Sequence, residues 1–328
     1  MDLLPPPSLR DDDIVAMRCG IRPHRRGCVR VEREHAFGKV LIHNYGHGGA
    51  GVTLSWGTAQ GVLARLTNEN PRDSIAVLGG GVVGLTTAYE LAKAGRSVRV
   101  YAGAFAMNTT SGLAGALWLP TGVAWGDTPE RQREFLDWLA LSKRRFLAQM
   151  AEEGWGVRTV PLWEPGHAQQ DPRFFQNGIV TDWSTVERLP IQGPVRIGQT
   201  WTALFIDTPI FLERLMTDLR SSGVQMVERS FDRAQQVADL PEPIVVNCLG
   251  LGARQVFADA AMVPVRGHLV HLRPQPVEYI YHAHYTYMFS RRSALVLGGS
   301  YEEGIDDPRV DESICRGILA KHRAAHGL

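Results

Sequence analysis

Cysteines, long apolar runs and excess charge are all scarce in this sequence, and each scarcity excludes a class of protein. The four cysteines, at positions 19, 28, 248 and 315, form no C-x-x-C pair, which is typical of reduced thiols rather than a disulfide framework. No apolar run is long enough to cross a bilayer. The opening MDLLPPPSLRDDD lacks the apolar core of a signal peptide. We therefore expect a cytoplasmic protein.

Neither sign of charge dominates, and this balance bears on possible partners. The formal net charge is +1 and charged residues make up 21% of the chain, so no general field draws it to nucleic acid or a membrane surface. The arginines between Arg18 and Arg33 lack interleaved aromatic residues, and we interpret most of them as a solvated strand face. The 328 residues are enough for two domains with a large core.

One stretch, Ser74–Arg99, carries the strongest pattern. An apolar run predicts a buried strand, glycines follow at G-x-G-x-x-G spacing, helical apolar spacing continues to Gly95, and a second strand is expected next. This order is typical of a Rossmann-type dinucleotide site, where a diphosphate lies against a glycine turn and a helix N-terminus. The alternative is a tight turn in another α/β domain. We predict cofactor contacts from Gly79, Gly81, Val82, Val83 and Gly84.

The acidic residue that usually holds the adenosine ribose, at the end of the second strand, is missing. The chain has no Asp or Glu between Glu90 and Asp127, and Gly103 stands near the expected place. No arginine follows the strand, as a phosphorylated ribose would favour. We expect other groups, such as Asn108 or the backbone, to hold the ribose, or else a weak site.

A second glycine-rich turn, Gly46–Gly51, stands between a predicted strand at Val40–Ile42 and a predicted helix at Val52–Leu66. Its backbone suits contact with a flat ligand, and the helix N-terminus would point at an electron-rich group. His43 and His47 are four residues apart, a spacing that on a helix suits a metal. The surrounding glycines argue against a helix there, so we expect turn-forming histidines and no metal site.

The remaining chain predicts further helices and sheet. The segment Asn108–Gly122 is rich in small and hydroxyl residues, which suits either contact with a cofactor ring or a plain loop before a core strand. In chain order we also expect a solvated linker at 1–13, helices opening at Thr128 and Thr208, short strands over 155–204, a strand pair over 279–299 and a helix over 315–326.

Together these segments resemble the D-amino-acid oxidase family of flavoproteins. GGGVVG at 79–84 is similar to the opening FAD fingerprint of that family, and TTSGLAGALW at 109–118 to its flavin-ring segment. VNCLG at 246–250 and VRGH at 265–268 match its middle signatures. HNYGHGGAGVTLSWG at 43–57 resembles its late signature, and CGIRP at 19–23 the place of its substrate-carboxylate arginine. The matches span nearly the whole chain, so they are more specific than the glycine fingerprint alone.

The order of these segments differs from that of the family. There the FAD fingerprint lies at the N-terminus and the G-I-R-P and H-N-Y-G-H-G-G segments at the C-terminus. Here the late segments come first, and residues 67–73 join them to the fingerprint. We infer a circular permutation, which requires that the old termini lie close together and that the new break falls in an exposed connection. A link of seven residues reaches at most about 25 Å.

The resemblance implies a role for individual residues. Arg22 would take the substrate carboxylate in a two-pronged contact, Tyr287 would hydrogen-bond the same carboxylate, and the Gly49 carbonyl would receive the substrate amine. The implied cofactor contacts are Gly48, Gly51, Val52 and Thr53 at the flavin pyrimidine edge, Thr109 and Thr110 in the segment that leads to the ring, Ala114, Gly115, Ala116 and Leu117 along the isoalloxazine, and the Phe231 backbone at the adenine.

Two positions depart from the family pattern. A second family tyrosine, four residues before Tyr287, is replaced by Ala283, with Tyr281, His284 and Tyr285 close by. Leu119 stands where a glutamine is common. The side-chain preference is therefore open.

The fold implied is mixed α/β, a circularly permuted D-amino-acid-oxidase-like arrangement. It has a Rossmann-type FAD-binding domain at 35–125 and 205–262 and an antiparallel-sheet substrate domain at 1–34, 126–204 and 263–328. The activity implied is FAD-dependent oxidative deamination of a D-amino acid by hydride transfer to flavin, with molecular oxygen as the second substrate. The products are an imino or 2-oxo acid, ammonia and hydrogen peroxide.

Three other functions stay open. The first is a glycine, secondary-amine or pathway-specific amine oxidase of the same fold. The second is a nicotinamide-dependent dehydrogenase, against which the flavin-side segments argue. The third is a flavin-binding protein without turnover. The expected partners are a small amino acid or amine and oxygen, and a homodimer is allowed.

Overall fold

The computed structural model describes residues 3–115, 117–166, 171–283 and 286–328, and its chain forms two compact units. Unit 1 comprises Met1–Ile21, Arg158–Asp207 and Val265–Leu328. Unit 2 comprises Arg22–Val157 and Thr208–Pro264. The chain passes from unit 1 to unit 2 within β1 (Ile14–Arg25) and from unit 2 to unit 1 within β11 (Met262–Leu272).

The unit boundaries differ from the predicted domains mainly at residues 22–34 and 126–157, which group with unit 2. The first segment does so because β2 (Arg30–Ala36) pairs along its whole length with β3 (Lys39–Tyr45). The second does so because α4 (Pro129–Met150) packs on α1 (Gly51–Ala64). A Cβ at Gly57 of α1 would overlap the Trp138 carbonyl oxygen of α4, so the two helix backbones touch.

Unit 2 is built on a sheet whose described strands follow the order β2-β3-β10-β4-β5-β9. The strands β3, β10 (Ile244–Asn247), β4 (Ile75–Gly80), β5 (Val98–Phe105) and β9 (Gln225–Glu228) run parallel, and β2 is antiparallel at the edge. Val246 of β10 pairs with Ile42 on one side and Val77 on the other. Strands from both glycine-rich stretches therefore flank the same central strand.

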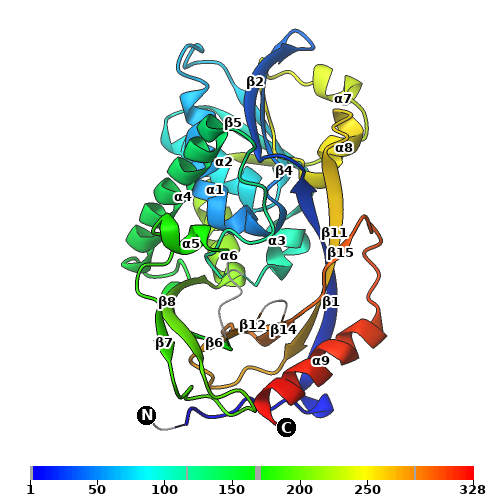
Figure 1. The fold of residues 1–328 in the computed structure, drawn as a ribbon. Helices are drawn as coiled ribbons and strands as arrows, with labels where there is room; N and C mark the ends of the chain where they lie inside the picture. The colour runs from blue at the N-terminus through cyan, green and yellow to red at the C-terminus, as the bar shows by residue number, and fades with distance from the viewer. Residues whose placement is uncertain (1–2, 116, 167–170, 284–285) are drawn as a thin grey trace. The chain divides into compact units, whose positions relative to one another are not determined.

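Helices cover both faces of this sheet. On one face α1 packs against α2 (Val82–Lys93), and α2 packs against α6 (Thr208–Ser221), as Figure 1 shows. On the other face, Leu41, Leu78 and Val245 share a core with Val237 of α7 (Gln235–Ala238) and Val256 of α8 (Ala253–Val256). Because successive strand residues point to opposite faces, both faces of the central strands are apolar and buried.

The predicted helix starts are confirmed. Thr128 is the N-cap of α4, where its hydroxyl accepts from Arg131 N–H at 3.3 Å, and α6 begins at Thr208. The large apolar residues on one side of α4, which are Phe135, Trp138, Leu139 and Phe146, are buried, whereas Met150, the last residue of the helix, is 41% exposed.

The other sheet has the order β1-β11-β14-β13-β12-β6-β8-β7, with β15 (Glu302–Glu303) paired to β11. The predicted strand pair over 279–299 is corrected to three strands, β12 (Ile280–Ala283), β13 (Thr286–Ser290) and β14 (Leu295–Gly298), because the segment turns twice. These strands and β11 pair antiparallel, whereas β12 pairs with β6 (Val157–Pro165) in parallel. The remaining elements are α5 (Arg173–Gln176), β7 (Ser184–Val186), β8 (Gly198–Ile206) and α9 (Glu312–His326).

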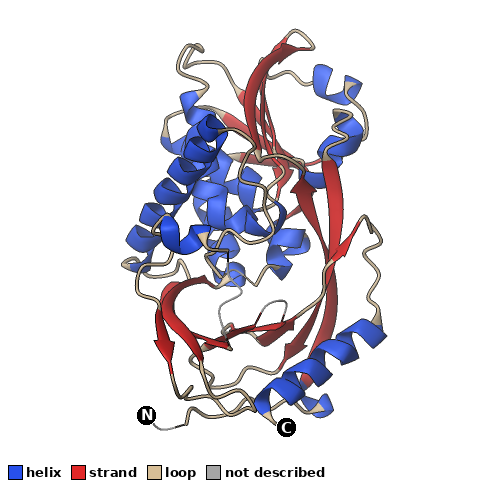
Figure 2. Cartoon of the chain, in the orientation of Figure 1, coloured by secondary structure: helices blue, strands red, loops and turns tan. Residues whose placement is uncertain are grey.

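One face of this sheet is closed by α9, drawn in blue against the red strands in Figure 2. Cys315, Ile318 and Leu319 of α9 share a core with Met288 and Leu297 of β13 and β14. Among the described helices of the chain, none is long and apolar enough to cross a membrane.

The first residues are not the solvated linker that the sequence predicts. Leu9 is 3% exposed and belongs to the core beneath α9, and Asp13 is 7% exposed. Ser8 and Gln275 exchange two hydrogen bonds, at 2.7 and 2.8 Å, and Arg323 of α9 donates to the Leu9 oxygen at 2.8 Å. Backbone contacts with distant residues, which composition does not reveal, hold this segment on unit 1.

Candidate functional site

The glycine turn between β4 and α2 has the geometry of a diphosphate cradle. Gly79 has a φ of +119°, and a Cβ there would overlap the Cys248 carbonyl oxygen. A Cβ at Gly84 would overlap the Gly79 carbonyl oxygen. Gly81 is the N-cap of α2 without a side-chain cap, and Leu85 N–H makes a helical bond back to its oxygen at 3.0 Å. The N–H groups of Val83 and Gly84 lie in the first helical turn before Leu85, where they can donate to an anion.

Hydroxyl side chains from the following segment lie beside this turn. A Cβ at Gly81 would be 3.1 Å from Ser111 Oγ and 3.7 Å from Thr109 Oγ1. Val82 N–H donates to Ser111 Oγ at 2.9 Å. The structure therefore brings the predicted Thr109 to the turn and adds Ser111, which the sequence analysis missed. The signal was its place in a run of hydroxyl residues that opens α3 (Thr110–Leu113).

The second glycine loop is fixed to the chain that follows α3. Gly49 N–H donates to the Gly122 oxygen at 3.0 Å, and a Cβ at Gly48, where φ is +53°, would overlap the same oxygen. Thr53 Oγ1 donates to the Leu119 oxygen at 3.2 Å. The predicted pyrimidine-edge residues therefore lie against the end of the predicted ring-facing segment.

That ring-facing segment is described at Ala114, Gly115 and Leu117, whereas the predicted contact Ala116 lies outside the described residues. Ala114 leaves α3 with φ −56° and ψ 133°, and its oxygen accepts from Thr208 Oγ1 at 3.2 Å. The segment is thus anchored at the start of α6.

The two glycine-rich stretches meet at the N-termini of α1 and α2. A Cβ at Gly51, the first residue of α1, would lie 3.8 Å from Val82 Cγ1, the first residue of α2. One turn further on, Thr86 Oγ1 donates to the Ser55 oxygen at 3.3 Å. Val52 and Thr53 are buried at 6% and 2% exposed. Two positive helix ends from distant parts of the sequence therefore lie side by side.

Arg22 lies on β1 next to this loop. His24 of β1 forms a β-bridge with His47, and its Nδ1 lies 3.4 Å from the Gly122 oxygen. Alternate residues of a strand share a face, so Arg22 and His24 are on the same face of β1. Arg22 is half-buried. Unit 2 thus places the predicted carboxylate arginine two residues from the strand position that contacts the glycine loop.

At the far end of the cradle, Phe231 packs with the end of β5. Its ring meets Tyr101 edge-on at 6.2 Å, and the Arg229 guanidinium lies over it at 5.2 Å. A Cβ at Gly103 would overlap Ser230 Oγ. Ser230 therefore stands where the missing ribose acid is expected, and the exposed Asn108 follows on a separate short 3₁₀ turn, Ala106–Asn108. Ser230 carries no local signal in the sequence, because only the β5–β9 pairing brings it to Gly103.

In unit 1, Tyr287 lies on the face of the sheet opposite to α9. A Cβ at Gly298 would overlap the Tyr287 ring, and this ring stacks on Phe289 at 4.8 Å with an interplanar angle of 22°. The residue between them, Met288, points into the core with α9. This face of the sheet therefore carries two stacked aromatic rings, one of which bears the Tyr287 hydroxyl.

The strand pairing explains what accompanies Tyr287. His282 pairs directly with Tyr287, so it shares the same face, and its Nδ1 lies 3.9 Å from Glu164 Oε1. Tyr281 pairs with Met288 and its ring lies 4.9 Å from that of His326, so it faces α9 instead. Ala283 packs against the same core as Tyr281, so the position of the missing tyrosine also lies on the face opposite to Tyr287. The other two neighbours that the sequence suggests, residues 284 and 285, lie outside the described residues.

The two histidines of the late signature are structural in this fold. His47 Nε2 lies 3.1 Å from Thr58 Oγ1, and burial lowers the pKa of His47 to about 3. His43 bonds to Glu34 and Asn247, and burial lowers its pKa as well. Burial also raises the pKa of the Cys248 thiol to about 12. These three side chains therefore stay uncharged near neutral pH.

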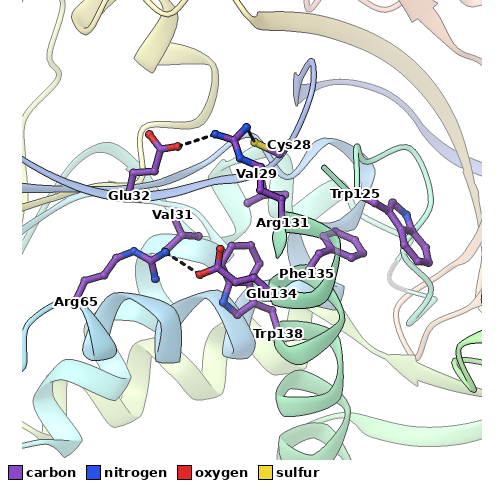
Figure 3. Close-up of a pocket in the computed structure, with 10 residues that line it drawn as sticks. All are labelled: Cys28, Val29, Val31, Glu32, Arg65, Trp125, Arg131, Glu134, Phe135 and Trp138. Atoms are coloured by element: carbon purple, nitrogen blue, oxygen red, sulfur yellow. Dashed lines mark hydrogen bonds and ion pairs between the residues drawn. The ribbon is translucent and has the colours of Figure 1, made fainter. Parts of the chain in front are cut away.

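A small cavity in unit 2 is lined by none of the site residues described above (Figure 3). It has a volume of about 90 Å³ and lies between β2 and α4. Its charged groups are matched, with Arg65 2.7 Å from Glu134 and Arg131 3.6 Å from Glu32. This cavity is too small for a dinucleotide and offers it no unbalanced charge.

The features of unit 2 fit FAD. The cradle excludes side chains where a diphosphate must approach the backbone, and the α2 N-terminus offers N–H donors to its negative charge. A second helix N-terminus, that of α1, adjoins the segment predicted to face the ring. Ser230 and Phe231 supply a hydroxyl and an aromatic surface at the other end of the sheet edge.

Comparison with known proteins gives the same cofactor. A family model described as FAD dependent oxidoreductase matches residues 74–326. A D-amino-acid oxidase of Streptomyces coelicolor is 30% identical over 281 residues, covering 77% of this chain and 79% of the relative. A human D-aspartate oxidase is 28% identical over 257 residues, covering 75% of this chain and 74% of the relative.

Solved structures share the fold at low sequence identity. A glycine oxidase of Bacillus cereus superposes with a TM-score of 0.56 at 17% identity, covering 77% of this chain and 78% of that one. An iminodiacetate oxidase from a Chelativorans species gives a TM-score of 0.56 at 15% identity, covering 77% of this chain and 79% of the other.

Proposed function

The chain belongs to the FAD dependent oxidoreductase family, and we propose that within this family it catalyses the oxidative deamination of a D-amino acid. The observation that carries the proposal is the similarity to the Streptomyces D-amino-acid oxidase over most of both chains. The meeting of Gly51 and Val82 supports it, because the loop implied to hold substrate and ring adjoins the turn that fits the diphosphate.

In this proposal the residues of the chain bind and orient the amino acid. Bound FAD would act as the two-electron oxidant. The Arg22 guanidinium and the Tyr287 hydroxyl hold the substrate carboxylate, and the Gly49 carbonyl accepts a hydrogen bond from the amine. Fixing the substrate at three points directs its Cα–H bond, so positioning accounts for most of the rate enhancement. The imino acid formed is hydrolysed to a 2-oxo acid and ammonia, and oxygen is reduced to hydrogen peroxide.

Ser230 is our candidate for the ribose contact. Its hydroxyl lies where a side chain at Gly103 would be, at the end of the second strand of the dinucleotide unit. An uncharged hydroxyl makes a weaker hydrogen bond to a ribose hydroxyl than a carboxylate does, so we expect moderate rather than tight FAD affinity.

The order of the chain is best explained by a circular permutation. The family match begins at residue 74 and leaves out residues 1–73, although these contribute β3 beside the central β10. The link at 67–73 is a short turn, held by bonds such as Arg96 Nη2 to the Asn70 oxygen at 3.0 Å. In unit 1, Arg323 of α9 bonds to Leu9, so the segments that would be joined in the family order lie together.

This permutation can be tested by restoring the family order. A gene encoding residues 74–328, a short glycine–serine linker and residues 3–66 should yield a protein that binds FAD with a similar dissociation constant. A protein that folds but does not bind FAD would argue that residues 1–66 have a different origin and role. The unaltered chain, expressed and titrated in parallel, is the control.

The activity is tested by peroxide release from the FAD-loaded protein. We expect peroxide and 2-oxo acid with members of a panel of D-amino acids and neither with their L enantiomers. Peroxide only with glycine or with secondary amines would assign the chain to an amine oxidase instead. A yellow protein inactive on every substrate would support flavin binding without turnover.

A further inference from the structure

A chain of hydrogen bonds runs from the surface of β2 to the turn beneath the glycine cradle. Glu34 Oε1 lies 3.0 Å from His43 Nε2, and His43 Nδ1 lies 3.0 Å from Asn247 Nδ2. Asn247 Oδ1 accepts from Leu249 N–H at 3.1 Å. His43 and Asn247 are 0% exposed, whereas the Glu34 side chain is 45% exposed. A buried histidine therefore connects a surface carboxylate to a buried turn.

The hydrogen bonds of Asn247 decide which ring nitrogen of His43 carries the proton. Asn247 Oδ1 is used by Leu249 N–H, so the group that Asn247 offers to His43 is its amide NH₂, which only donates. His43 Nδ1 must then be an acceptor, and the ring proton must lie on Nε2, where it is donated to Glu34. The neutral Nε2–H form of His43 is thus the one that satisfies every partner.

The turn after β10 is in direct contact with the cradle. Cys248 N–H donates to the Leu78 oxygen at 2.8 Å, which places the Cys248 carbonyl against Gly79 so closely that a Cβ there would overlap it. The Cys248 Cβ is also 3.5 Å from where a Cβ of Gly84 would lie. A movement of Asn247 and its turn therefore moves the surface on which the first and last glycines rest.

We propose that His43 is a positioning residue for FAD, which sets the affinity of the cradle by holding Asn247 in the orientation that caps Leu249. The proposal rests on the assignment of FAD to the Gly79–Gly84 turn. His43 acts through Asn247 and Cys248, and its expected effect is on cofactor affinity rather than on the chemical step.

A lower pH should weaken the hydrogen bond by which His43 holds Asn247 in place. A protonated His43 carries N–H at both ring nitrogens, so its Nδ1–H would face the Asn247 amide NH₂ and force the amide to turn. Rotation presents NH₂ to Leu249 N–H and breaks the cap. Burial lowers the pKa of His43, and the Glu34 carboxylate opposes that shift. The described charged and aromatic groups that face the ring are Glu34, Glu32 and Arg30 of β2, Tyr45 at 5.5 Å and Phe257 at 5.3 Å.

The first test compares two substitutions of His43 by titrating FAD into the apoprotein and following quenching of flavin fluorescence. His43→Asn keeps an acceptor near the Nδ1 position, and His43→Leu removes it. Since an unsatisfied buried donor is costly, we expect His43→Leu to raise the FAD dissociation constant about tenfold or more and His43→Asn to stay within about threefold. Equal effects of the two variants would overturn the proposal.

The second test uses a matched pair of acids on β2. The side chains of Glu34 and Glu32 are 45% and 44% exposed, and both lie within 4.0 Å of Arg30. Of these two acids, only Glu34 bonds to His43 among the described contacts. The wild-type FAD affinity should fall as pH decreases. Glu34→Gln should move this acidic limb to lower pH by roughly half a unit or more, and Glu32→Gln by less. His43→Asn should flatten the limb, and equal shifts for the two acids would contradict the assignment.

Two controls separate the possible failures. Gly84→Ala should abolish FAD binding, and if it does not, the cofactor site itself is wrong. If Gly84→Ala abolishes binding while His43→Leu leaves it intact, the site stands and the role of His43 falls. His268→Leu removes another fully buried histidine, in unit 1, and should lower the unfolding temperature without changing FAD affinity. A loss of affinity in both histidine variants would mean general destabilisation.

Discussion

Gly84 approaches the carbonyl oxygen of Gly79 so closely that no side chain fits between them. This contact joins the first turn of α2 to the end of β4, so it fixes the direction of the helix N-terminus relative to the strand. Gly84→Ala should therefore displace the cradle and abolish detectable FAD binding. Flavin absorbance of the purified protein measures this outcome.

A glycine of the same chain provides the control for that substitution. Gly317 lies in α9, and a Cβ there would meet nothing within 4 Å. Gly317→Ala should leave FAD binding unchanged and stabilise the protein by about 0.5–1 kcal/mol, since alanine is the better helix former. Retained FAD in Gly84→Ala would mean that the diphosphate lies elsewhere.

Ser230 gives a prediction about the ribose end. Ser230→Ala removes a single neutral hydrogen bond, so the FAD dissociation constant should rise roughly three- to tenfold with little change in kcat at saturating FAD. Ser230→Asp would supply the acid that the dinucleotide pattern lacks and should tighten binding. An unchanged affinity in both variants would remove Ser230 from the site. Asn108→Ala is the comparison, because Asn108 is the sequence-based candidate.

The pair of implied carboxylate contacts predicts a graded loss of substrate affinity. Arg22→Ala should raise KM about a hundredfold while FAD stays bound. Arg22→Lys should recover only part of this loss, because lysine keeps the positive charge but lacks the two parallel N–H donors of the guanidinium. Tyr287→Phe keeps the stack on Phe289 and should raise KM about tenfold. Normal steady-state kinetics from Arg22→Ala would end its assignment.

The sequence predicted the parts of this fold that depend on local spacing. The turn at Gly79–Gly84 and the helix start at Thr128 follow from glycine, proline and capping patterns that act over a few residues. Ser111, Ser230 and His282 could not be found in this way, because each reaches its place through strand pairing or a loop contact with a distant segment. The grouping of residues 126–157 with unit 2 depends on the same kind of distant contact, the close approach of Gly57 to α4.

The buried His47 predicts how stability depends on pH. Burial lowers its pKa from 6.5 to about 3, so between these values the unfolded chain binds a proton that the folded chain does not. Stability therefore falls as pH decreases from 6.5 towards 3, by about 1.4 kcal/mol per pH unit from this group. His47→Gln removes the titration and keeps a polar group for Thr58, so urea unfolding at several pH values should show a shallower dependence. His35→Gln, at an exposed position of β2, should not change the slope.

The buried carboxylate near Tyr287 predicts a substrate preference. Glu164 is 2% exposed and lies 3.9 Å from His282, which shares a sheet face with Tyr287. A carboxylate on this face repels an acidic substrate side chain, so acidic D-amino acids should be poorer substrates than neutral ones. Glu164→Gln removes that repulsion and should raise kcat/KM for D-aspartate relative to D-alanine by about tenfold. Glu302→Gln removes a carboxylate from β15, where it pairs with Arg266, and should leave the ratio unchanged. An unchanged ratio in Glu164→Gln would place the substrate side chain away from this face.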